Sequence, residues 1–209
     1  MFYLFLEKVI EMDKMDKKNI IKELYKESAY SKDAVNKTEF NPQSVGSPIY
    51  GEVVAEGADS MVKKFEKHFN ENTVFYDLGS GLGKMVIHIG LQYGVKKSIG
   101  IEFSKERSCV SERLKQEYAK DAKNIEFYCG NILDYNLSDA NVIYMDNTVF
   151  PNHISRKIFD KLPKGCLVLY KSPYNKSNLP EGFDVSKQNY SKNLVKRTYN
   201  QNSLFWYFK

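Results

Sequence analysis

The glycine-rich segment Asp77-Leu-Gly-Ser-Gly-Leu-Gly-Lys84 has the residue types and spacing of a ligand-binding turn. Its glycines let the backbone turn tightly and approach a ligand, and the N–H groups of a following helix face that ligand. A phosphate-binding P-loop is excluded, because Leu78 stands where that motif needs glycine and Met85 follows the lysine in place of serine or threonine. Dinucleotide sites use GxGxxG, whereas GxGxG after an acidic residue is typical of S-adenosylmethionine sites. A structural turn without a ligand is the alternative.

Two further positions fit the same ligand. Glu102 ends the next apolar run, where a carboxylate can accept both ribose hydroxyls. Asn131 follows the third run, where its amide can bond adenine, and Ile132 offers the base an apolar face. The structural alternatives are a charge at a helix N-terminus for Glu102 and an Asx-turn for Asn131. The turn and these positions converge only on a class I methyltransferase fold.

Short apolar runs alternate with helix-compatible stretches through most of the chain. The runs are rich in β-branched and aromatic residues and predict strands at residues 73–77, 98–102, 125–129, 141–145 and 166–170. Helices are expected at residues 53–69, 83–93, 104–121 and 152–161. This order favours a parallel sheet with helices on both faces.

The two ends of the chain depart from this alternation. Residues 183–186 and 203–208 predict two strands without a helix between them, which indicates an antiparallel hairpin at the sheet edge. Residues 1–27 predict two short amphipathic helices, and a connector follows. The expected fold is α/β: a Rossmann-like class I methyltransferase sheet, mostly parallel with a C-terminal antiparallel hairpin. We therefore divide the chain into a helical N-terminal segment with its linker, 1–45, and a methyltransferase domain, 46–209.

Composition excludes several classes of protein. The chain has 209 residues, of which 42% are hydrophobic and 27% charged, so it is not disordered as a whole. No apolar run approaches the roughly 18 residues of a membrane span, and three separated cysteines form no disulfide framework, so we expect an intracellular protein. The three histidines show no metal-ligand spacing. A net charge of +5, mostly from lysine, permits contact with nucleic acid without specifying it.

The combination of motifs resembles one family, the disruptor-of-telomeric-silencing (Dot-one-like) histone lysine methyltransferases. The resemblance covers about residues 45–175. It is carried by Ile49-Tyr-Gly-Glu52, Phe75-Tyr-Asp-Leu-Gly-Ser-Gly81, Ile99-Gly-Ile-Glu102, Gly130-Asn-Ile132, Asp146-Asn-Thr-Val-Phe150 and Lys171-Ser-Pro-Tyr174. The chain departs from the family at three places. Asn131-Ile132 replaces Asp-Phe, and Asp146-Asn147 replaces paired asparagines. At the third place the family has a small residue followed by lysine, whereas here Lys171 precedes Ser172.

The resemblance implies a role for individual residues. A loop with Tyr50 and Glu52 closes over the methionine part of the cofactor, the turn holds its amino-acid end, and Phe103 lies beside the adenine. The full set of expected cofactor contacts is Tyr50, Glu52, Asp77, Gly79, Ser80, Gly81, Gly83, Glu102, Phe103, Asn131 and Ile132. Asn147 and Phe150 line a channel for the substrate lysine, and Tyr174 is a further aromatic candidate.

Methyl transfer from a sulfonium needs alignment and a neutral amine more than it needs acid–base groups. An aromatic channel favours the neutral amine by desolvation. We therefore expect a protein lysine methyltransferase that uses S-adenosylmethionine, releases S-adenosylhomocysteine and acts on histone or a histone-like protein. The partner is then a protein or nucleosome, and the location is nuclear if the substrate is chromatin and otherwise cytoplasmic. The alternatives are methylation of another protein lysine, RNA or a small molecule, and a catalytically silent binding module.

Overall fold

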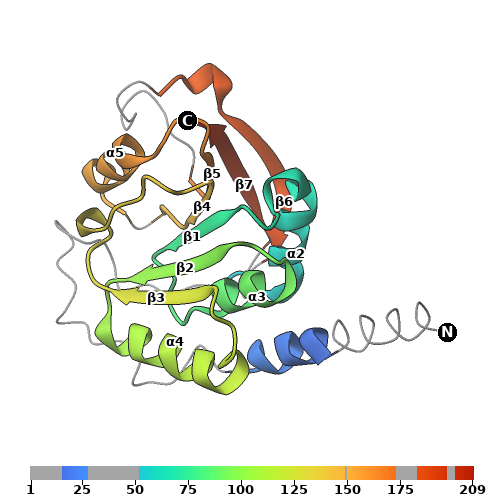
Figure 1. The fold of residues 1–209 in the computed structure, drawn as a ribbon. Coiled ribbons are helices and arrows are strands. Elements are labelled where there is room, and N and C mark those ends of the chain that lie inside the picture. The colour runs from blue at the N-terminus through green and yellow to red at the C-terminus, as the bar shows by residue number, and fades with distance from the viewer. Residues whose placement is uncertain (1–15, 28–51, 149, 173–182, 197–200) are drawn as a thin grey trace.

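The computed structural model describes residues 16–27, 52–148, 150–172, 183–196 and 201–209. Its centre is a seven-stranded sheet in the order β3-β2-β1-β4-β5-β7-β6 (Figure 1). The strands are β1 (Val74–Leu78), β2 (Lys97–Glu102), β3 (Ile125–Cys129), β4 (Val142–Met145), β5 (Leu167–Tyr170), β6 (Asn189–Lys196) and β7 (Gln201–Phe208). The α-helix α2 (Ala55–Lys64) precedes β1, and α3 (Lys84–Gln92), α4 (Lys105–Tyr118) and α5 (Asn152–Lys161) lie between the parallel strands.

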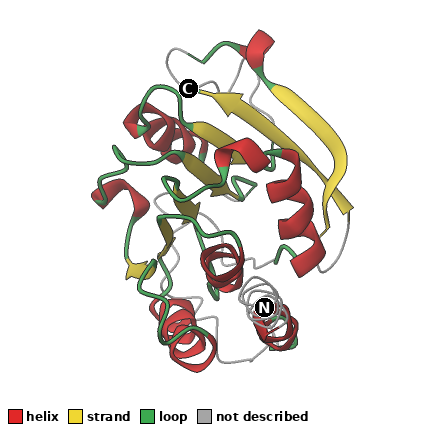
Figure 2. Cartoon of the chain, turned by 45° about the vertical axis from the view of Figure 1, so that its right-hand side comes forward, coloured by secondary structure: helices red, strands yellow, loops and turns green. Residues whose placement is uncertain are grey.

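The first five strands are parallel, and the last two run antiparallel at one edge. β1 pairs with β2 and β4, while β3 and β5 extend the parallel set on either side. β7 pairs antiparallel with β5 and with β6, and Figure 2 shows this long hairpin as the outer edge of the sheet. The predicted fold class is therefore confirmed: mostly parallel α/β with a C-terminal antiparallel hairpin.

The first strand of the hairpin was expected at the wrong residues. Residues 183–186 form a turn that leads into a 3₁₀ helix, Val185–Lys187, and β6 begins only at Asn189. The reason is local: the Asp184 carboxylate accepts hydrogen bonds from the backbone N–H and the hydroxyl of Ser186. This Asx-turn competes with extended structure.

Helices cover both faces of the sheet, so the parallel strands are buried on both sides. One face of β1 packs with α5 through residues such as Tyr76 and Ile158. The other face packs with α2 and α3 through residues such as Phe75 and Met61. Within the part of the chain that the structure describes, no helix is long and apolar enough to cross a membrane, and no group of His, Cys, Asp and Glu could hold a metal ion.

A helix over residues 16–24 adds to the second face. Ile21 and Leu24 are buried in a cluster with residues of α3 and α4, among them Val86 and Leu114. Figure 1 shows this helix, in blue, beside α4. Residues 1–15 and the connector lie outside the described residues, so the division near residue 45 stays a prediction. The contact itself makes residues 16–27 part of the packed molecule.

Candidate active site

The glycine turn lies at the carboxyl end of β1, between β1 and α3. The N–H groups of Gly79 and Ser80 both donate to the Ile101 carbonyl, at 2.8 and 3.1 Å, which pins the turn to the end of β2. Gly79, Gly81 and Gly83 have φ values of +84°, +57° and +75°. Residues with a Cβ rarely adopt this left-handed backbone, so the turn needs glycine at these three positions.

The glycines differ in what surrounds them. A Cβ at Gly83, the N-cap of α3, would lie 2.4 Å from the Phe127 ring, so packing inside the domain alone requires glycine there. Gly79 is exposed, and a Cβ there would lie 3.2 Å from the Phe150 ring. The outer side of the turn therefore faces the loop that follows β4. Ser80 is half-buried, and its buried hydroxyl oxygen has no hydrogen-bond partner among the residues that the structure describes.

Glu102 is the acidic group that ties the turn to β2. Its side chain is 5% exposed; Oε2 accepts the Gly81 N–H at 2.8 Å, and Oε1 accepts the Ser104 N–H at 2.9 Å. A carboxylate has about four lone-pair sites, so each oxygen retains capacity for a further donor such as a ribose hydroxyl. Asp77 is also 5% exposed and stands beside Gly100 of β2 in the sheet register. Two buried carboxylates thus belong to the carboxyl ends of neighbouring strands.

Past β3, the structure shows the Asx-turn that was the structural alternative. The Asn131 side-chain oxygen accepts the Leu133 N–H at 3.0 Å and caps a short 3₁₀ helix. Ile132 is 8% exposed and packs in the core, which leaves little apolar surface for a base. Phe103 follows β2 and is half-buried. Adenine contact at these three residues stays a prediction.

Asn147 joins the ends of β4 and β5. Its Nδ2 donates to the Ser172 carbonyl at 2.9 Å, and its Oδ1 accepts the N–H groups of Lys171 and Ser172 at 3.1 and 2.7 Å. The side chain is 7% exposed, and three hydrogen bonds hold it in one orientation. Asn147 therefore orders the wall in which Phe150, packed at the core margin, faces the glycine turn. Its place in a substrate channel stays a prediction.

Two predicted site residues, Tyr50 and Tyr174, lie outside the described residues. Glu52 is described, and its Oε2 lies 3.0 Å from the Lys84 ammonium in a buried ion pair. Lys84, 4% exposed, is the site residue that sequence reasoning missed. The only local signal was its position directly after the turn, because its partners are distant in the chain.

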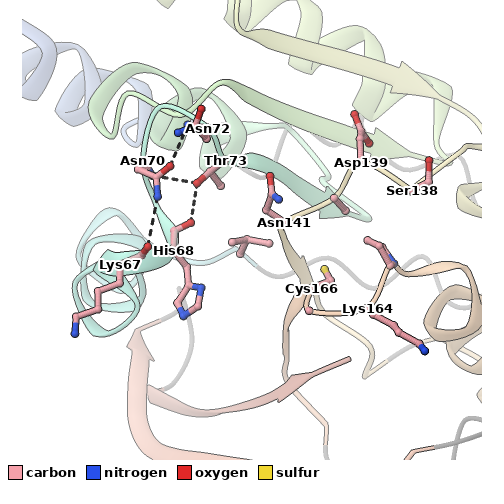
Figure 3. A pocket seen from close by; sticks show the side chains of 14 residues that line it. Lys67, His68, Asn70, Asn72, Thr73, Ser138, Asp139, Asn141, Lys164 and Cys166 are labelled. Carbon is pink, nitrogen blue, oxygen red and sulfur yellow. Dashed lines mark hydrogen bonds between the residues drawn. The ribbon is translucent and has the colours of Figure 1, made fainter.

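A cavity lies at the amino ends of β1, β4 and β5, at the opposite end of the strands from the glycine turn (Figure 3). It has a volume of about 520 Å³ and is lined by the turns before β1, β4 and β5. Its side chains bond the chain itself: the Thr73 hydroxyl donates to the His68 carbonyl, and the Asn70 side-chain oxygen accepts the Asn72 N–H. The Asn141 side-chain oxygen accepts the Val74 N–H. These polar groups stabilise turns, and none of the predicted site residues that the structure describes lines this cavity.

The residues at the carboxyl edge fit S-adenosylmethionine. Left-handed glycines keep side chains off the turn, the Glu102 oxygens can accept hydroxyl protons, and the buried carboxylates suit a cofactor with a net positive charge. These features are those of the crevice at the carboxyl ends of strands where such folds bind ligands. The arrangement can hold a cofactor and present it to the loop after β4.

Comparison with solved structures shows the same fold. An RNA methyltransferase from Salinibacter ruber, in complex with S-adenosyl-L-homocysteine, matches with a TM-score of 0.53 and 21% identity, covering 75% of this chain and 92% of that one. Together with the turn and Glu102, this defines the fold of the class I methyltransferases, a class whose cofactor is S-adenosylmethionine.

The family follows from the sequence comparisons. The family model described as histone methylation protein DOT1 matches residues 30–207, and the chain belongs to this family. A histone-lysine N-methyltransferase specific for H3 lysine 79, from Candida glabrata, is 27% identical over 138 residues, covering 58% of this chain and 21% of that protein. A protein-lysine N-methyltransferase from Saccharolobus islandicus is 28% identical over 81 residues, covering 36% of this chain and 47% of that protein. The chain thus spans only about a fifth of the Candida glabrata relative.

Proposed function

We propose that this protein is an S-adenosylmethionine-dependent protein lysine methyltransferase that acts on a histone or a histone-like protein. Family membership supports the reaction, and one observation about the site carries the substrate class. The Phe150 ring lies so close to Gly79 that a Cβ there would stand 3.2 Å from it. An aromatic wall therefore borders the cofactor turn, where an unbranched amine chain would approach.

The residues of this chain would position the cofactor and the substrate amine and remove water from the amine. They take no direct part in the bond changes. When bound, S-adenosylmethionine supplies an electrophilic methyl group on its sulfonium. Glu102 and the glycine turn would orient the cofactor, and Asn147 holds the wall opposite the turn in place. Alignment of this kind, with the reacting atoms about 3–3.5 Å apart, is the main source of acceleration for such a displacement.

The substrate amine must be neutral to attack. A lysine has a pKa of about 10.4, and an apolar wall such as Phe150 lowers the pKa of an amine by desolvation. The Asp146 carboxylate accepts the Thr148 hydroxyl at 2.6 Å, so this acid is engaged in ordering the loop. Turnover should therefore rise with pH by up to about tenfold per unit between pH 7 and about 9.

The experiment that tests this function is transfer of a radiolabelled methyl group to nucleosomes, free histones, unrelated lysine-rich proteins and RNA, at several pH values. Label in histone lysine with a rate that rises with pH is expected. Label only in RNA, or a rate independent of pH on every protein, would contradict the proposal. Calorimetry with S-adenosylhomocysteine separates a silent module from an enzyme, because a silent module without a cofactor site gives no binding heat.

Nucleic acid is part of the proposed partner surface when the substrate is a nucleosome. Lysines outnumber arginines in this basic chain, so contacts to phosphate would be diffuse and sensitive to salt. Activity on nucleosomes should then fall more steeply with salt than activity on free histone. The protein would act in the nucleus in that case.

A further inference from the structure

Lys84 is a buried cation at the first position of α3, directly after the glycine turn. It is 4% exposed, and its ammonium group donates to the Glu27 main-chain carbonyl at 2.6 Å and to Glu52 Oε2 at 3.0 Å. The two acceptors stand 57 and 32 residues earlier in the chain. One side chain thus joins the cofactor turn to two distant segments.

Neither α3 nor burial by itself favours a lysine at this position. A cation in the first turn of a helix opposes the helix dipole, and an unpaired buried ammonium loses its hydration. What stabilises Lys84 is therefore its pair of acceptors. Glu52 supplies the opposite charge, and the Glu27 carbonyl lies just beyond the helix of residues 16–24, where a cation is favourable.

A second connection fixes the same N-terminal segment, residues 16–27, to α3. The Tyr25 hydroxyl lies 3.3 Å from His88 Nδ1, and His88 Nε2 lies 3.0 Å from Asp59 of α2. Burial, together with the nearby carboxylates of Glu52, Asp59 and Asp77, raises the pKa of Tyr25 well above its usual value. Tyr25 therefore keeps its proton and can donate it in this contact.

We infer that Lys84 is a positioning residue which couples the docking of the N-terminal segment to cofactor binding at the glycine turn. The inference rests on the proposed function, because it needs the turn to be the cofactor site. Lys84 acts through Glu52 and the Glu27 carbonyl rather than through the reacting atoms. Docking of residues 16–27 holds Lys84, and Lys84 holds Glu52 beside the start of α3, into which the glycine turn leads.

Such coupling is reciprocal. If the docked segment improves cofactor affinity, bound cofactor must stabilise the docked segment by the same factor. The two effects are measured independently: affinity by calorimetry with S-adenosylhomocysteine, and docking by hydrogen exchange of residues 16–27. A merely structural lysine would change stability without making exchange in this segment respond to the cofactor product.

The first test uses the full chain with Lys84→Met and a matched control, Lys97→Met. Lys97 forms an ion pair with Glu126 at 2.8 Å, but this pair is partly exposed and lies away from the turn. Lys84→Met should bind S-adenosylhomocysteine about tenfold more weakly, within the usual range of coupling between sites. Lys97→Met should bind like the wild type. Equal affinity of Lys84→Met and the wild type would overturn the inference.

A double-mutant cycle tests the route through Glu52. Because Lys84 acts on Glu52, adding Glu52→Gln to Lys84→Met should weaken binding far less than Glu52→Gln does alone. Additive losses would mean that the two residues act separately and would overturn this route.

Hydrogen exchange completes the design. In the wild type and Lys97→Met, S-adenosylhomocysteine should slow exchange of residues 16–27; in Lys84→Met this response should disappear. A wild-type exchange rate that does not change when S-adenosylhomocysteine binds would overturn the inference.

If Lys84→Met does not fold, Tyr25→Phe is the variant that tests the inference. This substitution loosens docking of residues 16–27 without touching the turn, and it should weaken binding of S-adenosylhomocysteine about threefold. Unchanged affinity and exchange in Tyr25→Phe would then overturn it.

A failure of the proposed function and a failure of the inference give different results. A wild-type chain that does not bind S-adenosylhomocysteine removes the proposed function and the inference with it. A wild type that binds, with variants that bind equally well, removes the inference alone.

Discussion

The carboxyl and amino ends of the parallel strands form two edges of the sheet, and both are rich in turns and polar side chains. They differ in whether their charged side chains are buried or exposed. At the carboxyl edge, Asp77, Lys84 and Glu102 are each 5% exposed or less. At the amino edge, where the cavity of Figure 3 lies, Lys67 and Lys164 remain exposed. Burying a charge is costly unless it is paired or hydrogen-bonded, so such groups concentrate where their arrangement serves a ligand. In this protein, buried charge, and not the cavity, marks the end of the strands where we propose that the cofactor binds.

The largest effect is expected from a bulky residue in the turn. Gly81→Arg should abolish methyl transfer and cofactor binding, because its backbone is left-handed at φ +57° and a side chain would occupy the space of the cofactor. The matched control is Gly165→Arg at the amino edge, which has φ +83° and open space around it. Both variants carry backbone strain, so only loss of activity confined to Gly81→Arg supports the comparison. Methyl transfer and thermal unfolding measure the two effects.

A second test removes one negative charge at the carboxyl end of β2 and one near the amino end of β3. Glu102→Gln should weaken binding of S-adenosylhomocysteine by about 1.5–3 kcal/mol, the range for hydrogen bonds to a charged group. Glu126→Gln, which alters the partly exposed pair with Lys97, should leave affinity unchanged. Calorimetry measures both, and an unaltered dissociation constant for Glu102→Gln would remove this carboxylate from the site.

A third test separates turnover from affinity. Phe150→Ala should widen and hydrate the lysine channel and lower kcat, while affinity for the cofactor changes by only a few tenths of a kcal/mol. Phe208→Ala is the control, because Phe208 is 46% exposed and its ring lies against His68 near the amino edge. Equal loss of kcat in both variants would show that the aromatic residue acts through stability and not through the channel.

The smallest effect is expected from the exposed ion pair. Lys97→Met should change the free energy of unfolding only slightly at neutral pH, because solvent screens this partly exposed ion pair. The hydrogen bond from Lys97 lowers the pKa of Glu126, so the pair stabilises the fold above the unfolded pKa of about 4.3 and loses this effect as pH falls through the lowered value. Urea unfolding at pH 7 and pH 3 checks this. A difference from the wild type that persists at pH 3 would contradict an ionic origin.

Most of the fold was predictable from the sequence because its determinants are local. A run such as Val142–Met145 is apolar on both faces, which is what a central parallel strand needs, and the helices between such runs follow from their spacing. The strand predicted at residues 183–186 was wrong because the Asp184 carboxylate accepts a hydrogen bond from the Ser186 N–H. This local bond competes with extended structure, and the pattern of apolar residues does not indicate it.

The parts of the candidate site that depend on local backbone structure were predictable from the sequence, and the parts that depend on distant contacts were not. The glycine turn could be recognised because its left-handed backbone needs glycine at fixed spacing. Glu102 could be recognised because it stands at the end of a predicted strand, and that position follows from the local sequence pattern. The bonding of Asn147 could not be recognised, because its three hydrogen bonds reach residues 171 and 172, which only the pairing of β4 with β5 brings near.

The sequence by itself determined the order of elements, the left-handed turn and the family, since each depends on neighbours within a few residues or on a pattern along the chain. Only the tertiary structure decided which charges are buried. A lysine after a turn is ordinarily solvated, and Lys84 is buried because the Glu27 carbonyl and the Glu52 carboxylate reach it from segments that the fold alone places side by side. The difference is physical: backbone conformation is a local property, whereas the loss of hydration at a charged group depends on everything packed around it.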